Sequence, residues 1–248
     1  MEEKRGQMKK GDVRRDEILA TAWRLFSERG YEKTSVQDIL DEIGFSKGGF
    51  YHHFDSKLEL LEAICENAAE TSAEKAKQAA QAEGTPMQRL SRMLEQAAFW
   101  QDRDENQVAM LIGVAYREDS ALMRERMKVR QLQSLVPVFS DVMAEGCRTG
   151  EIYSENTDQS AEMILRLYQQ LIDELSFLMR EDQTREEILS RAVTKLRSYR
   201  QAMERILIAP IGSLEMTDTD SLKRLVFQVL AARNKNKEEA GNREANHG

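Results

Sequence analysis

Residues that interrupt regular structure are scarce in this sequence. Only three prolines and thirteen glycines are spread over 248 residues, whereas an all-β sandwich or barrel needs a turn about every eight to twelve residues. Between these breaks, apolar residues recur every three or four positions, as in amphipathic helices. The chain is also rich in Ala, Leu, Glu, Gln, Arg, Lys and Met, which favour helices. The sequence therefore predicts an all-α fold.

The same periodicity divides the chain into four parts. We expect a basic flexible leader at 1–12, a three-helix domain at 13–60, a larger helical body at 61–233 and a disordered tail at 234–248. Pro137 predicts a kink or a break in one helix of the body. The individual helices are predicted at 13–29, 35–42, 47–53, 56–82 (linking the two domains), 86–101, 105–117, 119–148, 158–181, 185–208 and 219–233.

The two short helices of the first domain have the pattern of a helix-turn-helix. Thr34 caps the first of them and Gln37 completes a capping box, Gly44 provides the turn, and Ser46 caps the second. In such a unit the second helix enters the major groove of DNA. Two helical glycines cost about 1 kcal/mol each, so Gly48-Gly49 indicates that another molecule approaches the backbone there. We expect the helix to be anchored on one face, by Phe50 and Phe54.

Charge is distributed in a way that fits this interpretation. Residues 1–57 hold eleven Lys or Arg and eleven Asp or Glu, so the rest of the chain carries the whole net charge of −7. A polyanion would be attracted to the first quarter of the chain and repelled by the body. The alternative is a merely solvated leader. Basic side chains cluster at the start: Lys4, Arg5, Lys9, Lys10, Arg14 and Arg15.

Several classes of protein are excluded by what the sequence lacks. No apolar run approaches the roughly twenty residues of a membrane span, and residues 1–15 carry no signal core. We therefore expect a cytoplasmic protein, in which Cys65 and Cys147 stay reduced. The histidines and cysteines lack the spacing of metal ligands. No catalytic triad and no phosphate loop is present, so we expect neither an enzyme nor a cofactor.

The body offers two predicted sites, each with a plain alternative. Two adjacent long helices have broad apolar faces, which predicts a symmetric four-helix dimer interface; the alternative is an ordinary core within one chain. The predicted interface consists of Ile164, Tyr168, Leu171, Leu175, Leu178, Leu196 and Met203. Methionine suits pockets for apolar ligands, and the alternative is again core packing. The predicted pocket consists of Trp100, Met110, Tyr116, Phe139, Met143, Tyr168 and Phe177.

The first domain also resembles a known family over about 48 of the 248 residues. It is similar to the amino-terminal domain of TetR/AcrR-family transcriptional regulators. It differs in having Leu40 where alanine is usual and in the paired glycines. The residues that carry the resemblance are Arg15, Glu17-Ile18-Leu19, Ala22, Leu25-Phe26, Glu28, Gly30-Tyr31, Thr34-Ser35-Val36, Ile39, Gly44, Ser46, Gly48, Phe50-Tyr51, His53-Phe54, Ser56-Lys57 and Leu60.

The resemblance implies roles for particular residues. Thr34, Ser35 and Ser46 would contact phosphates, and Lys57 would hold a backbone phosphate. Tyr31 would pack and touch DNA. Base and phosphate contacts would come from Lys47, Gly48, Tyr51, His52 and His53.

For the whole chain, the resemblance implies a homodimer that binds a palindromic operator in double-stranded DNA. It would be a regulator, most often a repressor, released by a small and largely apolar effector bound in the body. Two other functions compete with it. One is an enzyme, which the missing catalytic residues disfavour. The other is a helical adaptor that binds a protein partner through the apolar side of 219–233.

Overall fold

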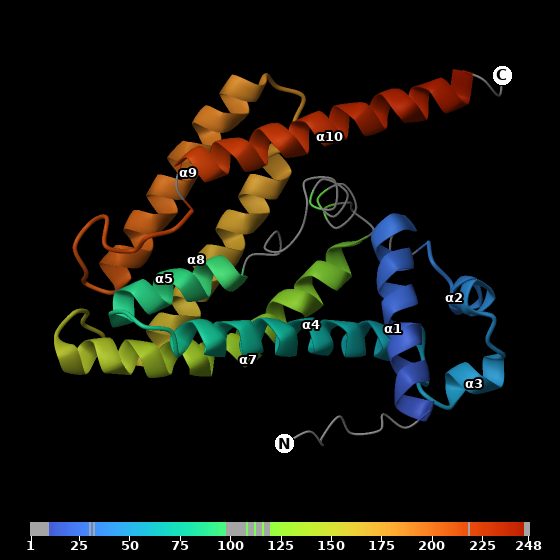
Figure 1. Cartoon of the computed structure of the whole chain (residues 1–248), viewed down its shortest axis with the longest axis horizontal. Coiled ribbons are helices and arrows are strands. Elements are labelled where there is room, and N and C mark those ends of the chain that lie inside the picture. The colour runs from blue at the N-terminus through green and yellow to red at the C-terminus, as the bar shows by residue number, and fades with distance from the viewer. Residues whose placement is uncertain are drawn as a thin grey trace, which may run out of the picture.

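The structure is a computed structural model that describes residues 10–29, 31, 33–97, 108, 112, 116, 120–217 and 219–245. Across these residues the chain forms helices and turns and no strand (Figure 1). The predicted all-α class is thereby confirmed. Most of the leader lies outside the described residues, as do most of the helix expected at 105–117, Trp100 and Met110.

The amino-terminal domain is built from α1 (Lys10–Arg29), α2 (Val36–Ile43) and α3 (Lys47–Tyr51). Apolar side chains from all three helices and from the start of the next helix meet in one core. Gly44 ends α2 in the left-handed conformation, with φ of 69°, which costs glycine little. Fully buried members of this core include Ile18, Leu25, Phe26, Ile39, Phe50 and Leu60.

The cap of α2 lies one residue later than the sequence predicted. The Ser35 hydroxyl accepts the Asp38 N–H at 3.1 Å, and Asp38 Oδ2 accepts the Ser35 N–H at 2.7 Å, which completes a capping box. Thr34 is instead fully buried, and its hydroxyl donates to the Leu25 carbonyl oxygen at 3.3 Å. The predicted Thr34–Gln37 capping box was therefore wrong, because the core takes up the Thr34 side chain.

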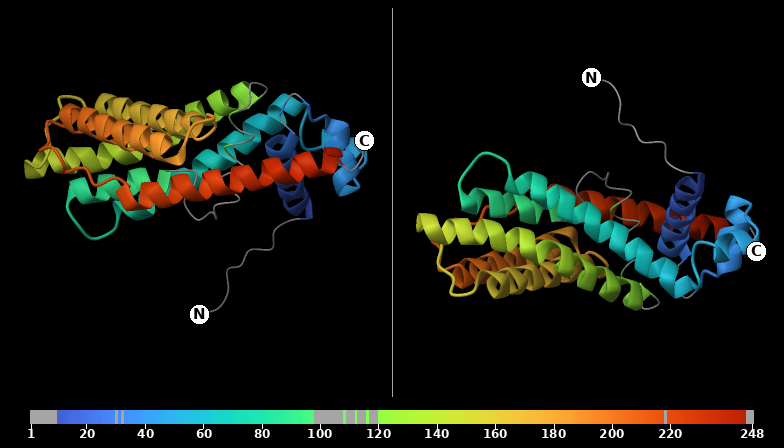
Figure 2. Two further views of the ribbon diagram at one scale, coloured as in Figure 1. Left: turned by 90° about the horizontal axis from the view of Figure 1, so that it is seen from above. Right: turned by 90° about the horizontal axis from the view of Figure 1, so that it is seen from below.

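One long helix, α4 (Lys57–Ala80), leads from this domain into the body, where it packs along a second long helix, α7 (Ala121–Thr149). Figure 1 places α1–α3 at one end of an elongated molecule, and the two views in Figure 2 show the body helices stacked beyond them. Helix α7 runs through Pro137 as one element, so the predicted break is absent. The remaining body helices are α5 (Pro86–Ala97), α8 (Thr157–Leu178), α9 (Arg185–Ile206) and α10 (Thr219–Ala245).

The broad apolar stripe of α8 is filled within a single chain. Its first half packs in a core with α5 and α7, and its second half packs in another core with α9 and α10. A helix with partners on two sides needs a stripe wider than one contact requires. The predicted dimer-interface residues Ile164, Tyr168, Leu171, Leu175, Leu178 and Met203 are all buried, and Leu196 packs partly buried against the second core. For the six buried residues the structure favours the alternative of an intrachain core over an interface, whereas Leu196 keeps part of its side chain exposed.

Helix α10 differs from expectation in two respects. Its apolar side, with Leu222, Val226, Val229 and Leu230, is buried against α8 and α9, so these side chains do not offer an adaptor surface. The helix also continues to Ala245, although the composition of 234–248 predicted disorder. Among the described residues, no helix is both long and apolar enough to cross a bilayer.

A carboxylate at the surface ties α8 to α9. Glu174 accepts hydrogen bonds from Lys195 Nζ at 2.6 Å and from the Tyr199 hydroxyl at 2.7 Å. These two bonds lower the pKa of Glu174 to about 2. An unfolded glutamate titrates near about 4.3, so the ionised form is stabilised by folding.

We therefore predict that Glu174→Gln lowers the free energy of unfolding by about 1 kcal/mol at pH 7. Because the folded pKa is depressed, the wild-type advantage is present above the unfolded pKa and disappears as the pH falls from about 4 towards 2. Denaturant unfolding of both proteins at pH 7, 5 and 3 measures this. A difference that stayed constant over that range would contradict the role of the ionised carboxylate.

Candidate functional site

Helix α3 is held by one face and presents the other to solvent. Phe50 is fully buried and Phe54 is 2% exposed, and their rings pack 5.9 Å apart. Tyr51 lies between them in sequence but is 54% exposed. Lys47, Gly48 and His52 are exposed, whereas His53 is half-buried. The predicted anchoring by the two phenylalanines is confirmed.

The amino end of α3 is capped by Ser46, whose hydroxyl accepts the Gly49 N–H at 3.3 Å. Ser46 is itself exposed, so its hydroxyl can still donate to an incoming acceptor.

The protein's own packing does not explain Gly48. A Cβ atom built at this position would meet nothing within 4 Å, and at Gly49 it would be 3.6 Å from the Ser46 hydroxyl oxygen, an ordinary contact. Alanine would therefore fit at both positions and would favour the helix. A glycine that the chain does not need sterically is consistent with close approach by another molecule.

The hydroxyls before α2 serve the fold first. Thr34 points into the core, so the predicted phosphate contact through its hydroxyl was wrong. Ser35 is exposed, but its hydroxyl donates to Asp38 Oδ2 at 2.6 Å. This bond, with the Ser35 N–H, holds the pKa of Asp38 below its ordinary value. A phosphate at Ser35 would compete with this carboxylate.

Lys57 is also engaged within the domain. Its Nζ donates to the carbonyl oxygens of Tyr31 at 2.8 Å and Thr34 at 3.1 Å, and it lies 4.1 Å from the centre of the Tyr31 ring. These contacts fasten the start of α4 to the turn between α1 and α2. Neither the charge pattern nor the resemblance predicted this clamp, because it depends on two backbone carbonyls that converge only in the fold.

Two arginines near the start of α1 lie over aromatic rings that flank α3 in the sequence. The Arg14 guanidinium lies 5.0 Å from the centre of the Phe45 ring, and that of Arg15 lies 5.2 Å from the Phe54 ring. Both side chains are exposed, and Figure 1 shows this end of α1 near α3. The sequence identified them as part of a basic cluster but not as neighbours of α3. They add permanent positive charge beside the exposed face of the helix.

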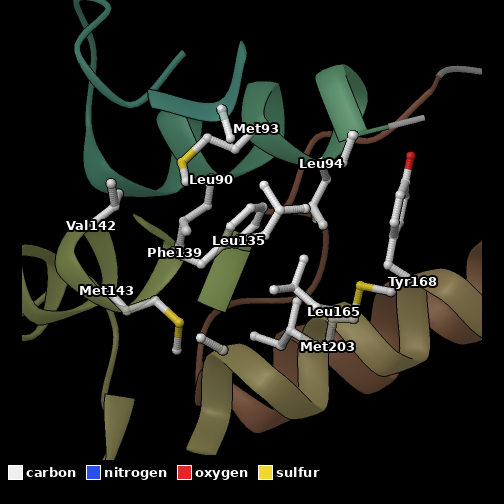
Figure 3. Close-up of a cluster of buried hydrophobic side chains, with 14 of the residues drawn as sticks. Leu90, Met93, Leu94, Leu135, Phe139, Val142, Met143, Leu165, Tyr168 and Met203 are labelled. Carbon is white, nitrogen blue, oxygen red and sulfur yellow. The ribbon is translucent and has the colours of Figure 1, made fainter. Parts of the chain in front are cut away.

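The residues predicted to line an effector pocket do not form one cluster. Phe139, Met143 and Tyr168 are buried in the first core of the body, with Leu165 and Met203 around them (Figure 3). Tyr116 and Phe177 form a separate edge-to-face pair with ring centres 5.0 Å apart. The Tyr116 hydroxyl donates to Asp173 Oδ1 at 2.9 Å, and burial raises the pKa of Tyr116. The described members of the predicted lining thus fall into two groups, and Trp100 and Met110 lie outside the described residues.

Comparison with known proteins assigns the amino-terminal domain. Residues 18–64 match the family model of bacterial regulatory proteins, tetR family. Over 51 residues the chain is 45% identical to the HTH-type transcriptional repressor KstR2 of Mycolicibacterium smegmatis. This match covers 21% of this chain and 25% of that protein. Over 92 residues it is 34% identical to the HTH-type transcriptional activator FasR of the same species, with 37% and 42% covered. The matches thus span less than half of each of these relatives.

Similarity in fold extends over most of the chain. The crystal structure of RolR in complex with the ligand resorcinol superposes with a TM-score of 0.54 and 16% sequence identity, covering 88% of this chain and 94% of that one. At this identity the likeness concerns the fold alone. The sequence matches confirm the resemblance seen in the residues of the helix-turn-helix: the amino-terminal domain of this chain is a domain of the tetR-family type.

Proposed function

We propose that this chain is a homodimeric, sequence-specific DNA-binding regulator of transcription, and specifically a repressor. The observation that carries the proposal is the exposed face of α3, with Lys47, Gly48, Tyr51 and His52 on an element that the core holds by its opposite side. The match to a named repressor supports repression, and the match to a named activator supplies the competing mode.

Contacts to DNA divide into those that position the protein and those that read bases. Phosphate contacts set the register, and groove contacts to base edges set the sequence preference. Arg14, Arg15 and Ser46 would meet phosphates around α3. Lys47, at the start of the helix, would meet a further phosphate, while Tyr51 extends from the exposed face towards the bases. Much of the body lies beyond α1–α3, although α4, α7 and α10 reach towards that domain (Figures 1 and 2). Much of the acidic charge of the body can therefore lie away from DNA.

The proposal includes a second copy of the chain. One small module buries only about 600–1,000 Å² on DNA, which limits its specificity. Two copies would read a palindrome whose half-sites lie about 34–36 Å apart or a multiple of that distance. The second copy would pair through side chains that remain exposed on the body, because most of the predicted interface residues are buried in the intrachain cores.

A small effector would release the protein from DNA by a shift in population. It would favour a conformer whose two α3 helices are wrongly spaced for the operator. A fold neighbour, RolR, was solved with a small ligand. The cores of this body are built largely from Leu, Met, Ala, Ile and Val side chains, which supports a largely apolar effector.

The exposed tyrosine of α3 gives the most direct test of the proposal. We predict that Tyr51→Ala lowers the affinity for a specific duplex about tenfold or more, because it removes a groove contact, while the thermal midpoint stays unchanged. The assay is fluorescence anisotropy at fixed salt, with the DNA upstream of the protein's own coding sequence and scrambled competitor.

The matched control is Tyr153→Ala, because Tyr153 is equally exposed, at 56%, but belongs to the body. Its substitution should leave DNA binding unchanged. Equal binding by both variants and wild type would count against the assignment of α3. Wild-type protein that failed to prefer any promoter fragment over scrambled DNA would refute the proposed function itself.

Lys47 and Lys57 should differ in how they respond to salt. Removing one phosphate contact reduces the slope of log affinity against log salt by about 0.9. We predict that Lys47→Met flattens the slope with no loss of stability, because the side chain is exposed. Lys57→Met should leave the slope unchanged and lower the free energy of unfolding by about 1–2 kcal/mol, because it removes two charge-assisted hydrogen bonds.

Salt titrations of DNA affinity and thermal unfolding of both variants measure these quantities. The clamp assigned to Lys57 would be wrong if Lys57→Met flattened the slope as much as Lys47→Met and unfolded at the wild-type temperature.

A further inference from the structure

The start of α7 belongs to the core of the amino-terminal domain, although the rest of the helix packs in the body. Met123 is 1% exposed and lies in the amino-terminal core, and Met127 packs against the same core one turn later. Figure 1 shows this end of α7, in green, reaching the region of α1, and both views in Figure 2 agree. A helix of the body therefore supplies two side chains to the core that holds α3.

A second face of the same turns is paired with α4. Arg126 Nη1 lies 3.3 Å from Glu62 Oε1, and Arg130 Nη1 lies 3.6 Å from Glu66 Oε1. These two ion pairs are one helical turn apart on both helices, so they align α7 with the helix that leaves the amino-terminal domain.

A third face of these turns is bound to α8. Lys128 Nζ donates to Asp173 Oδ2 and to Glu125 Oε1, and the Lys128 carbonyl oxygen accepts from Gln169 Nε2 at 3.1 Å. Asp173 is only 8% exposed, and its other oxygen accepts from Tyr116. Asp173 thus links Tyr116 and Lys128 through a buried carboxylate, and we call these three residues the Asp173 cluster.

We propose that the first three turns of α7 transmit changes in the hydrogen bonds of the Asp173 cluster to the amino-terminal domain. A ligand or substitution that alters the bonds of Asp173 changes what holds Lys128 against α8. Because Met123 and Met127 stand on the same rigid turns, a shift there is passed to the core around Phe50 and Phe54. This route is additional to a tilt of α4, and it extends the proposed function, on which it rests, by naming how the body regulates the DNA-binding end.

The charge geometry explains why Asp173 is suited to this role. The pair with Lys128 is partly buried, with side-chain exposures of 12% for Asp173 and 25% for Lys128. A buried carboxylate that loses one partner destabilises the fold, because little solvent is available to replace the lost contact. By contrast, the Arg166–Glu162 pair on the outer side of α8 is largely exposed, at 62% and 47%, and such pairs contribute little.

Hydrogen exchange on the full chain without DNA tests this coupling. Asp173→Asn conserves the side-chain shape but removes its charge. The expected result is at least about threefold faster exchange of amides in 18–29 and at the start of α7, with α9 unchanged, because a local opening is made easier. Glu162→Gln, which breaks the exposed pair on the same helix, should leave both regions at the wild-type rate.

Lys128→Gln provides a second variant that breaks the contact from α7. The double variant should exchange no faster in 18–29 than the faster single variant, because both substitutions act through one interaction. Unchanged exchange in the amino-terminal domain, or an equal increase across α9, would overturn the proposal. This readout needs no DNA, so it can fail while wild-type operator binding stands, and the reverse also holds.

In the DNA assay, Asp173→Asn should shift operator affinity at least about threefold relative to wild type, with the salt slope unchanged, since every phosphate contact is retained. Glu162→Gln should bind as wild type does. An altered exchange pattern without any change in affinity would overturn the regulatory part of the proposal.

Discussion

The burial of Phe50 and Phe54 determines how this protein can meet another molecule. Helix α3 has only five residues, too few to be stable as an isolated helix. Its orientation therefore depends on the two rings that enter the amino-terminal core, and on the Ser46 cap that begins it. Because that face is fixed, Lys47, Gly48 and Tyr51 lie on the side of the helix that faces solvent.

Around this anchor, polar groups serve the fold as well as the surface. The Thr34 hydroxyl and the Lys57 ammonium both bind backbone carbonyls near the turn that leads into α2. The orientation of α2 and α3 is thus set partly by buried or half-buried polar contacts, and the proposed DNA contacts come from other side chains.

In the body, apolar packing within the chain determines how the helices are arranged. Helix α8 lies between two apolar cores, so its wide stripe is used up by partners in the same chain. The start of α7 reaches back into the amino-terminal core. The two domains consequently share apolar side chains as well as the linking helix α4, which ties the position of α3 to the packing of the body.

Much of this could be predicted from the sequence, because helical periodicity and caps are local. Most of the described helices lie within a few residues of their predicted bounds, and the spacing of Phe50 and Phe54 identified the anchored face. Tertiary contacts limited the rest. Which of Thr34 and Ser35 caps α2 is decided by the Leu25 carbonyl, and the clamp at Lys57 requires two distant turns to meet. A wide apolar stripe such as that of α8 has the same pattern whether its second partner is another helix or another chain.

The central claim is that the outward face of α3 enters a DNA groove, and Gly48→Ala measures it most directly. The new methyl group meets nothing in the protein and should stabilise the helix by about 0.5–1 kcal/mol. At Gly49, alanine stabilises the helix similarly, but its methyl group lies towards the Ser46 hydroxyl. We predict that Gly48→Ala raises the thermal midpoint and weakens operator binding, whereas Gly49→Ala weakens it less. Full operator affinity in a stabilised Gly48→Ala protein would contradict the account.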